Sequence, residues 1–273
     1  MLMPSRLDIV RPGVCLLSVM GLVVGMILLD ISVNAWYLPM LSVALLCASG
    51  NTINDFFDRK IDAINRPNRP IPSGRMTPGE GFLIYLFLTF TGLLLSFFVS
   101  WNFFIFAAFN SIVIYLYSMK FKRTVLGNLV DTYLAVSVFI APVLIGGGIF
   151  DFPKSPLIFI ASISFFVNYG REILKSVEDV RGDKSAGART LPIVIGEKNA
   201  VLFGKIMVLV GSLFLFLPYY FGLFGEAYFI FSLALFLGVV FILGLKNASK
   251  VQRLIKIVMF LALLAFLAFS ASL

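Results

Sequence analysis

The chain has 273 residues, of which 60% are hydrophobic and only 13% are charged, and its formal net charge at pH 7 is +8. Soluble proteins carry roughly 25% charged residues, so this composition excludes an ordinary soluble domain and indicates an integral membrane protein. The sequence contains no histidine, which excludes a histidine-ligated metal and a histidine base. It also offers no soluble basic face of the kind that binds nucleic acid.

Nine apolar segments follow one another along the chain, each close to the ~20 residues that a membrane-spanning helix needs. Their predicted limits are 12–30, 36–56, 80–100, 102–119, 125–147, 156–178, 199–218, 226–245 and 251–271. We therefore expect an all-α integral membrane protein, a bundle of nine transmembrane helices. No low-complexity linker divides the chain, so residues 1–273 are expected to form a single domain.

Basic residues alternate from one side of the expected bundle to the other. They gather before the first segment and in the connections after segments two, four, six and eight. The opposite connections carry Asp30, Asp151, Lys154 and Glu226, so Lys154 is their only basic residue. Because basic connections stay in the cytoplasm, we expect an N-in, C-out protein of the plasma membrane.

The connection after the second segment concentrates charge in the stretch NDFFDRKIDAINRPNRPIPSG, residues 54–74. On a helix, the spacing of Asp55, Asp58 and Asp62 would put all three on one face. Neighbouring carboxylates repel one another unless a cation lies between them, and Mg²⁺ is the cation that prefers oxygen ligands. The following arginines offer forked donors for phosphate oxygens. A solvated loop that only orients the protein would explain the arginines but not the spaced aspartates.

A second acidic cluster lies after the sixth segment, in EDVRGDKSAGARTLP, residues 178–192, where Asp179 and Asp183 are one helical turn apart. We expect this stretch to be a loop on the same cytoplasmic side, so both clusters can meet over a central cavity that opens there. Together they could hold Mg²⁺ and a diphosphate, which becomes a better leaving group once neutralised. An allylic carbocation left behind would need a dry, aromatic pocket.

These motifs resemble those of the UbiA-type intramembrane prenyltransferases. The first stretch is similar to the family's N-D-x-x-D-x-x-x-D signature followed by R-P-x-x-S-G, and the second to its D-x-x-x-D motif. The segment YLYSMKFKR, residues 115–123, resembles the family's basic loop between spans four and five. The resemblance implies Mg²⁺-dependent transfer of a prenyl group from a prenyl diphosphate to an acceptor, at the cytoplasmic side.

The resemblance also implies roles for particular residues. The implied metal ligands are Asp55, Asp58, Asp62, Asp179 and Asp183, and all of these except Asp55 are also assigned catalytic roles. The implied substrate contacts are Asn54, Arg66, Arg69, Lys120, Lys122 and Arg189. Tyr115, Tyr117 and Tyr169 are expected near cytoplasmic helix ends, where an aromatic ring could line the pocket, and Tyr115 is added to the substrate contacts.

The second motif, REILKSVEDVRGDK (residues 171–184), resembles the archaeal branch that makes digeranylgeranylglyceryl phosphate for ether lipids. It departs from the more acidic version of the quinone-forming branches. The implied donor is geranylgeranyl diphosphate, and the implied acceptor is geranylgeranylglyceryl phosphate, which would attack through its free hydroxyl. The acceptor's phosphate would need cations, for which Arg171, Lys175 and Lys205 are candidates.

Two acids inside the segments have open assignments. Glu172 could take the proton of the acceptor hydroxyl as a base, or it could form an ion pair with Lys175 or Arg171. Asp131 is predicted to line the substrate pocket, although an interhelical hydrogen bond or a pair with Lys122 or Arg123 would also explain it.

Three other functions remain open at this stage. The acceptor could be aromatic, such as a quinone precursor. The protein could be a membrane transporter in which intramembrane charges line an ion path. It could also be a scaffold, for which the aspartate spacings would have no purpose.

Overall fold

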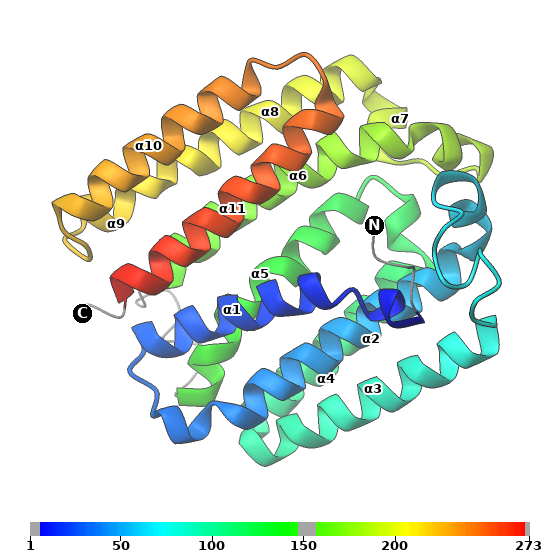
Figure 1. Ribbon diagram of the computed structural model, residues 1–273, viewed down its shortest axis with the longest axis horizontal. Helices are drawn as coiled ribbons and strands as arrows, with labels where there is room; N and C mark the ends of the chain where they lie inside the picture. Colours follow the sequence, from blue (N-terminus) through cyan, green and yellow to red (C-terminus); the bar gives the residue numbers. More distant parts are fainter. Residues whose placement is uncertain (1–5, 147–156, 271–273) are drawn as a thin grey trace.

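A computed structural model describes residues 6–146 and 157–270 of the chain, and within these ranges every regular element is a helix (Figure 1). The long helices are α1 (Pro12–Leu28), α2 (Tyr37–Asn65), α3 (Pro78–Val99), α4 (Trp101–Met119), α5 (Gly127–Gly146), α6 (Leu157–Ser185), α8 (Glu197–Leu213), α10 (Glu226–Leu243) and α11 (Ala248–Ser270). The shorter elements are η1 (Arg6–Val10), η2 (Val33–Ala35), η3 (Phe121–Arg123), α7 (Leu191–Ile195), η5 (Phe214–Phe216) and α9 (Leu217–Tyr220).

Eight helical segments in the described part of the chain are long and apolar enough to span a membrane. They confirm an all-helical, multi-pass membrane protein. The helix at the first predicted segment, α1, is shorter, with 17 residues. Asp151 and Lys154, used above to orient the bundle, lie outside the described residues, as do the predicted span ends at 147, 156 and 271.

Two of the predicted helix ends were wrong by about two helical turns or more. Helix α2 continues to Asn65 and α6 to Ser185, where the apolar patterns had predicted ends at 56 and 178. The stretch from Glu178 to Ser185, expected to be a loop, is therefore the last part of α6. A hydropathy pattern ends where polar residues begin, but the backbone stays helical because these polar side chains find partners inside the protein.

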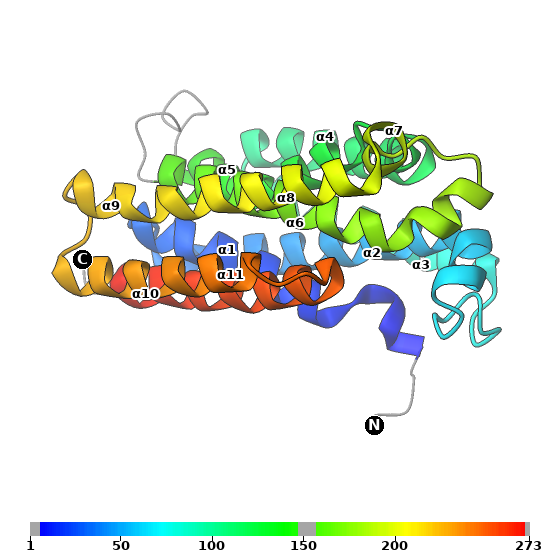
Figure 2. The same cartoon turned by 90° about the horizontal axis from the view of Figure 1, so that it is seen from above.

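Six helices form a closed ring in the order α1, α2, α4, α5, α6 and α11, each in contact with the next. Helix α3 covers the outside of α2 and α4, whereas α8 and α10 pack outside α6 and α11. Seen from above, α4 and α5 lie on the opposite side of the bundle from α10 and α11 (Figure 2). The C-terminal ends of α2 and α6 lie at the same end of the bundle, beside α7 and the connection that follows α2 (Figure 1).

The contact between α6 and α8 depends on the absence of a side chain at Gly170. A Cβ atom there would meet the backbone carbonyl of Gly204 and lie 2.8 Å from the Val208 Cγ2 atom. In a membrane, close backbone approach is a main source of helix association, because lipid removes the hydrophobic driving force. We therefore regard this contact as the point that fixes α6, the helix of the second acidic motif.

Replacing Gly170 with leucine should lower the stability of the protein by about 3 kcal/mol. The added side chain would have to displace backbone atoms of α8, which cannot move away alone. The measurement is the midpoint of thermal unfolding in detergent. Gly238→Leu is the matched control, since a Cβ at Gly238 of α10 meets nothing within 4 Å, and an equal loss in both variants would contradict the prediction.

Candidate active site

The first acidic motif occupies the C-terminal half of α2 and faces the interior. The residues Asp55, Asp58 and Asp62 are only 1%, 4% and 5% exposed. A buried carboxylate is costly unless it is paired and hydrogen-bonded. The positions of these three side chains therefore depend on the basic groups that meet them.

Basic side chains from three different parts of the chain pair with these carboxylates. Arg69, in the connection after α2, bridges Asp55 at 3.0 Å and Asp62. Arg11, which immediately precedes α1, also pairs with Asp55. Lys122, from η3 between α4 and α5, pairs with Asp58. The site thus joins three connections at one end of the bundle.

The second acidic motif comes to the same place from α6. Arg66, at the C-terminal end of α2, contacts the Asp179 carboxylate at 3.3 Å. The charge of Asp183 interacts with those of Asp58 and Lys122, so Lys122 lies between the two motifs. The structure therefore brings together two clusters that are more than 100 residues apart in the sequence.

Gly182 explains how α6 approaches α2 so closely. A Cβ atom at this position would run into the side chain of Asn65, the last residue of α2. Glycine is the residue that permits such an approach, because it leaves the space to its neighbour. Gly182 is thus a packing residue between the two motifs.

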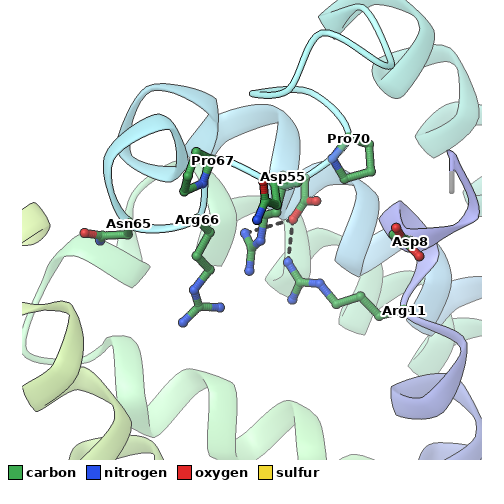
Figure 3. A pocket seen from close by; sticks show the side chains of 9 residues that line it. Asp8, Arg11, Asp55, Asn65, Arg66, Pro67 and Pro70 are labelled. Atoms are coloured by element: carbon green, nitrogen blue, oxygen red, sulfur yellow. Dashed lines mark hydrogen bonds and ion pairs between the residues drawn. The ribbon is translucent and has the colours of Figure 1, made fainter. Parts of the chain in front are cut away.

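A polar pocket of about 380 Å³ opens beside these groups. It is lined by Asp8, Arg11, Asp55 and the segment 65–70. Figure 3 shows Arg11 reaching to Asp55, with Arg66 extending into the same open space. Forked guanidinium groups that converge on a pocket match the geometry of phosphate oxygens.

A larger and mainly apolar cavity of about 450 Å³, which we call the membrane cavity, runs into the ring of helices. Arg11 lines this membrane cavity as well as the polar pocket, so the two adjoin. Its apolar walls include Phe103, Phe106 and Phe139. The polar pocket and the membrane cavity form one compartment with an apolar interior. We call its polar end, where Arg11, Asp55 and Arg66 lie, the charged mouth.

The wall of the membrane cavity also carries a group of charged side chains. Glu172 is buried on α6 and accepts from Arg171 at 2.5 Å and Lys175 at 2.6 Å. Asp131 of α5 lies beside Glu172, and Tyr117 of α4 interacts with both. The ion-pair alternative for Glu172 is therefore present in the structure, and its role as a base stays a prediction.

Several predicted residues lie elsewhere. Tyr115 packs against Phe57 and Tyr85 with ring centroids 5.6 Å and 6.3 Å away, so it faces α2 and α3. Tyr117 instead lines the membrane cavity, because residues two apart point to nearly opposite sides of a helix. Of the three tyrosines predicted to line the pocket, Tyr117 is the one that lines this cavity.

The remaining predicted contacts differ in position. Asn54 lines the cavity and accepts from the Ser118 hydroxyl at 2.8 Å. Lys120 and Arg189 are exposed, and the backbone N–H of Arg189 donates to the Arg123 carbonyl at 2.9 Å. Lys205 donates to the carbonyls of Leu243 and Leu245 at 2.6 Å and 2.8 Å, so it caps the end of α10 and is not available to a phosphate.

Sequence reasoning missed two cations. Arg11 was used only to orient the first segment, although an Arg-Pro pair directly before an apolar run was a visible signal of a helix start. Lys256 of α11 also lines the membrane cavity. It had no local signal, because its role depends on α11 packing against α6 and α1.

The two acidic motifs suit Mg²⁺ by the chemistry of their donors. The acidic groups of both motifs provide only oxygen ligands, which is the set that Mg²⁺ prefers. In the described residues no three carboxylates converge as a ready metal cluster, because Arg11, Arg69 and Lys122 lie against them. The oxygen donors fit Mg²⁺ once these basic side chains leave the carboxylates and bind another anion.

Known proteins share both sequence and fold with this chain. A model described as the UbiA prenyltransferase family matches residues 16–268. The chain is 36% identical to the digeranylgeranylglyceryl phosphate synthase of Methanopyrus kandleri, over 97% of this chain and 99% of that protein. A solved structure of digeranylgeranylglyceryl phosphate synthase in membranes has a TM-score of 0.77 at 32% identity and covers 98% of both chains. A UbiA homologue from Archaeoglobus fulgidus, bound to GPP and Mg²⁺, has a TM-score of 0.72 at 21% identity and covers 97% of this chain and 99% of its own, which concerns the fold alone.

Proposed function

The chain belongs to the UbiA prenyltransferase family, and we propose that it transfers a geranylgeranyl group from geranylgeranyl diphosphate to geranylgeranylglyceryl phosphate. The acceptor would attack through its free hydroxyl, in the synthesis of archaeal ether lipids. The relative from Methanopyrus kandleri, with its near-complete overlap, supports this choice of acceptor. The observation that carries the proposal is the meeting of two carboxylate motifs at the mouth of an apolar cavity.

The charged mouth is where we place the diphosphate of the donor. Arg11, Arg66, Arg69 and Lys122 surround the mouth and would bind its oxygens, exchanging their present aspartate partners for phosphate. Mg²⁺ would be held by Asp55, Asp58, Asp62, Asp179 and Asp183. When bound, the ion would neutralise charge on the leaving group.

The membrane cavity is where we place the prenyl chain. Its phenylalanine walls would exclude water from the allylic carbon once the diphosphate departs. Tyr117 is buried at the charged end of the cavity, beside Asp131 and near Asp58, so its ring would face a cation that forms between the two sites. Asp131 is proposed as a pocket residue. Glu172 remains our predicted base, which would require its present cationic partners to release it.

We further infer nine spans with the charged mouth facing the cytoplasm, in the plasma membrane. The 17 residues of α1 would extend about 26 Å, which is at the lower limit for a spanning helix. The alternation of basic and acidic connections supports the N-in, C-out orientation. The match of one family model to residues 16–268 is in keeping with the proposed single domain, 1–273.

The test is a turnover assay with purified protein, radiolabelled geranylgeranyl diphosphate and Mg²⁺. Geranylgeranylglyceryl phosphate and 4-hydroxybenzoate are offered separately, and we expect a diether product with the glyceryl phosphate only. Product with the aromatic acid only would overturn the proposed acceptor and retain the reaction. Absence of product with either acceptor would overturn the reaction and favour the transporter.

Removal of divalent cations should stop the reaction. With EDTA in excess we expect turnover to fall to background, because the carboxylates would have no ion with which to neutralise the leaving group. Added Mg²⁺ should restore the rate, whereas Na⁺ at the same ionic strength should not. Full activity in EDTA would contradict the assignment of the aspartates as metal ligands.

A further inference from the structure

Three basic side chains line one region of the membrane cavity, apart from those at the charged mouth. Arg171 and Lys175 come from α6, and Lys256 comes from α11. We call these three residues the cation cluster. The charge of Lys256 interacts with those of Arg171, Lys175 and Glu172, so the cluster forms one electrostatic unit across two helices.

A neighbouring carboxylate, Glu172, binds two of the three basic side chains. Glu172 accepts from Arg171 with one oxygen and from Lys175 with the other. It fixes two of the three cations, whereas Lys256 is exposed at the cavity wall. The Nε atom of Arg171 is buried and has no hydrogen-bond partner in the described part of the protein. A basic group facing a largely apolar cavity is costly to keep, so the arrangement points to an anionic ligand.

We propose that Arg171, Lys175 and Lys256 bind the phosphate group of the acceptor lipid, at an anion site separate from the diphosphate site. This inference rests on the proposed function, and it deepens that function by assigning the part of the acceptor that the cavity recognises. Glu172 holds Arg171 and Lys175 in place until the phosphate binds them, which would release its carboxylate for the role of base proposed above. Lys256 takes the place of Lys205, which is occupied at the end of α10.

The distance from the cluster to the reacting site suits a glyceryl phosphate. Lys175 lies one helical turn, about 6 Å along the axis, before Asp179 of the second motif. The free hydroxyl of geranylgeranylglyceryl phosphate is on the carbon next to the one that carries the phosphate. A phosphate held at the cluster would therefore leave this hydroxyl near the charged mouth, where the donor's allylic carbon would lie.

The composition of the cluster favours a phosphate over a neutral headgroup. Three basic side chains face two carboxylates, Glu172 and Asp131. An added anion would find both a forked donor on Arg171 and ammonium groups on two sides. A lipid with a free hydroxyl in place of the phosphate would leave these donors without a charged partner inside the cavity.

The experiment compares two acceptors with the whole protein in detergent. One acceptor is geranylgeranylglyceryl phosphate, and the other is geranylgeranylglycerol, which lacks the phosphate. The quantity measured is the preference, the ratio of kcat/KM for the phosphorylated acceptor to that for the other. Lys256→Ala should lower this preference by about 10- to 100-fold, the range expected for a lost hydrogen bond to a charged group. The KM of the donor should stay within about twofold.

Two further variants separate binding from folding. Lys256→Arg keeps the positive charge and should retain most of the preference. Lys250→Ala removes a positive charge from an exposed position on the same helix and should leave the preference unchanged. The thermal unfolding midpoint of each variant shows whether the fold is intact.

The outcomes distinguish failure of the proposed phosphate site from failure of the proposed reaction. A wild-type protein that forms product but shows no preference for the phosphorylated acceptor would overturn the inference alone. So would a Lys256→Ala variant that keeps its preference, or one that loses activity equally with both acceptors. Failure of the wild type to make a product from either lipid would overturn the proposed function, and the inference would fall with it.

Discussion

Replacing Asp58 with asparagine should lower kcat by about 10³-fold while the protein remains folded. Asp58 is buried at the meeting point of the two motifs, where it pairs with Lys122 and interacts with Asp183. Asparagine has nearly the same size and can still accept from Lys122, but it removes the negative charge that a divalent cation requires. Lys122 is 34% exposed, so water can solvate it when its partner becomes neutral.

The measurement is turnover with radiolabelled donor, together with the thermal unfolding midpoint. Asp179→Asn on α6 should have an effect of the same order, because in the proposed function both motifs would hold the metal and the diphosphate. Asp30→Asn is the matched control, since it makes the same chemical change at an exposed turn with φ of 51°, a conformation that asparagine also accepts. Full activity in Asp58→Asn would remove the two-motif site.

Gly182→Leu should reduce kcat by about 10²-fold, although it changes no charged group. The leucine would have to displace the Asn65 side chain at the end of α2 and push the second motif away from the first. A displacement of about 1 Å among reacting groups is enough for a loss of this size. Gly182→Ala should be milder, because the short Asn65 side chain can turn aside from one methyl group.

Arg181→Leu is the control for Gly182→Leu. Arg181 is exposed on the adjacent position of α6, so a leucine there adds the same side chain without entering the contact. Both variants are compared by kcat and by the KM of the donor. If Gly182→Leu and Arg181→Leu lose equal activity, the close approach of α2 and α6 is not what aligns the motifs.

The sequence was sufficient to predict the membrane class and the two acidic motifs, because both depend on local spacing. Asp55, Asp58 and Asp62 share a buried helical face, as periodicity alone requires. Helix ends were harder to place, since α2 and α6 remain helical through polar residues that hydropathy assigns to loops. The partners that keep these residues inside the protein come from distant segments.

The remaining parts of the site depend on tertiary packing. Tyr115 and Tyr117 are alike in sequence terms, and only the rotation of α4 decides that Tyr117 lines the cavity. Lys205 was the predicted cation and Lys256 was missed, because only the contact of Lys205 with the end of α10 and the position of α11 distinguish them. No pattern along the chain states that α11 closes the ring beside α1 and α6.

The length of α2 and α6 has a kinetic consequence. Each has 29 residues, or about 43 Å, against a hydrocarbon core of about 30 Å. The acidic ends of both helices would therefore stand among lipid headgroups, level with the phosphates of molecules that remain in the bilayer. The proposed lipid substrates would then meet the enzyme in two dimensions, and the rate would follow their mole fraction in the membrane. Diluting the substrates with inert lipid at constant bulk concentration would slow the reaction, and the product would enter directly the leaflet from which its precursors came.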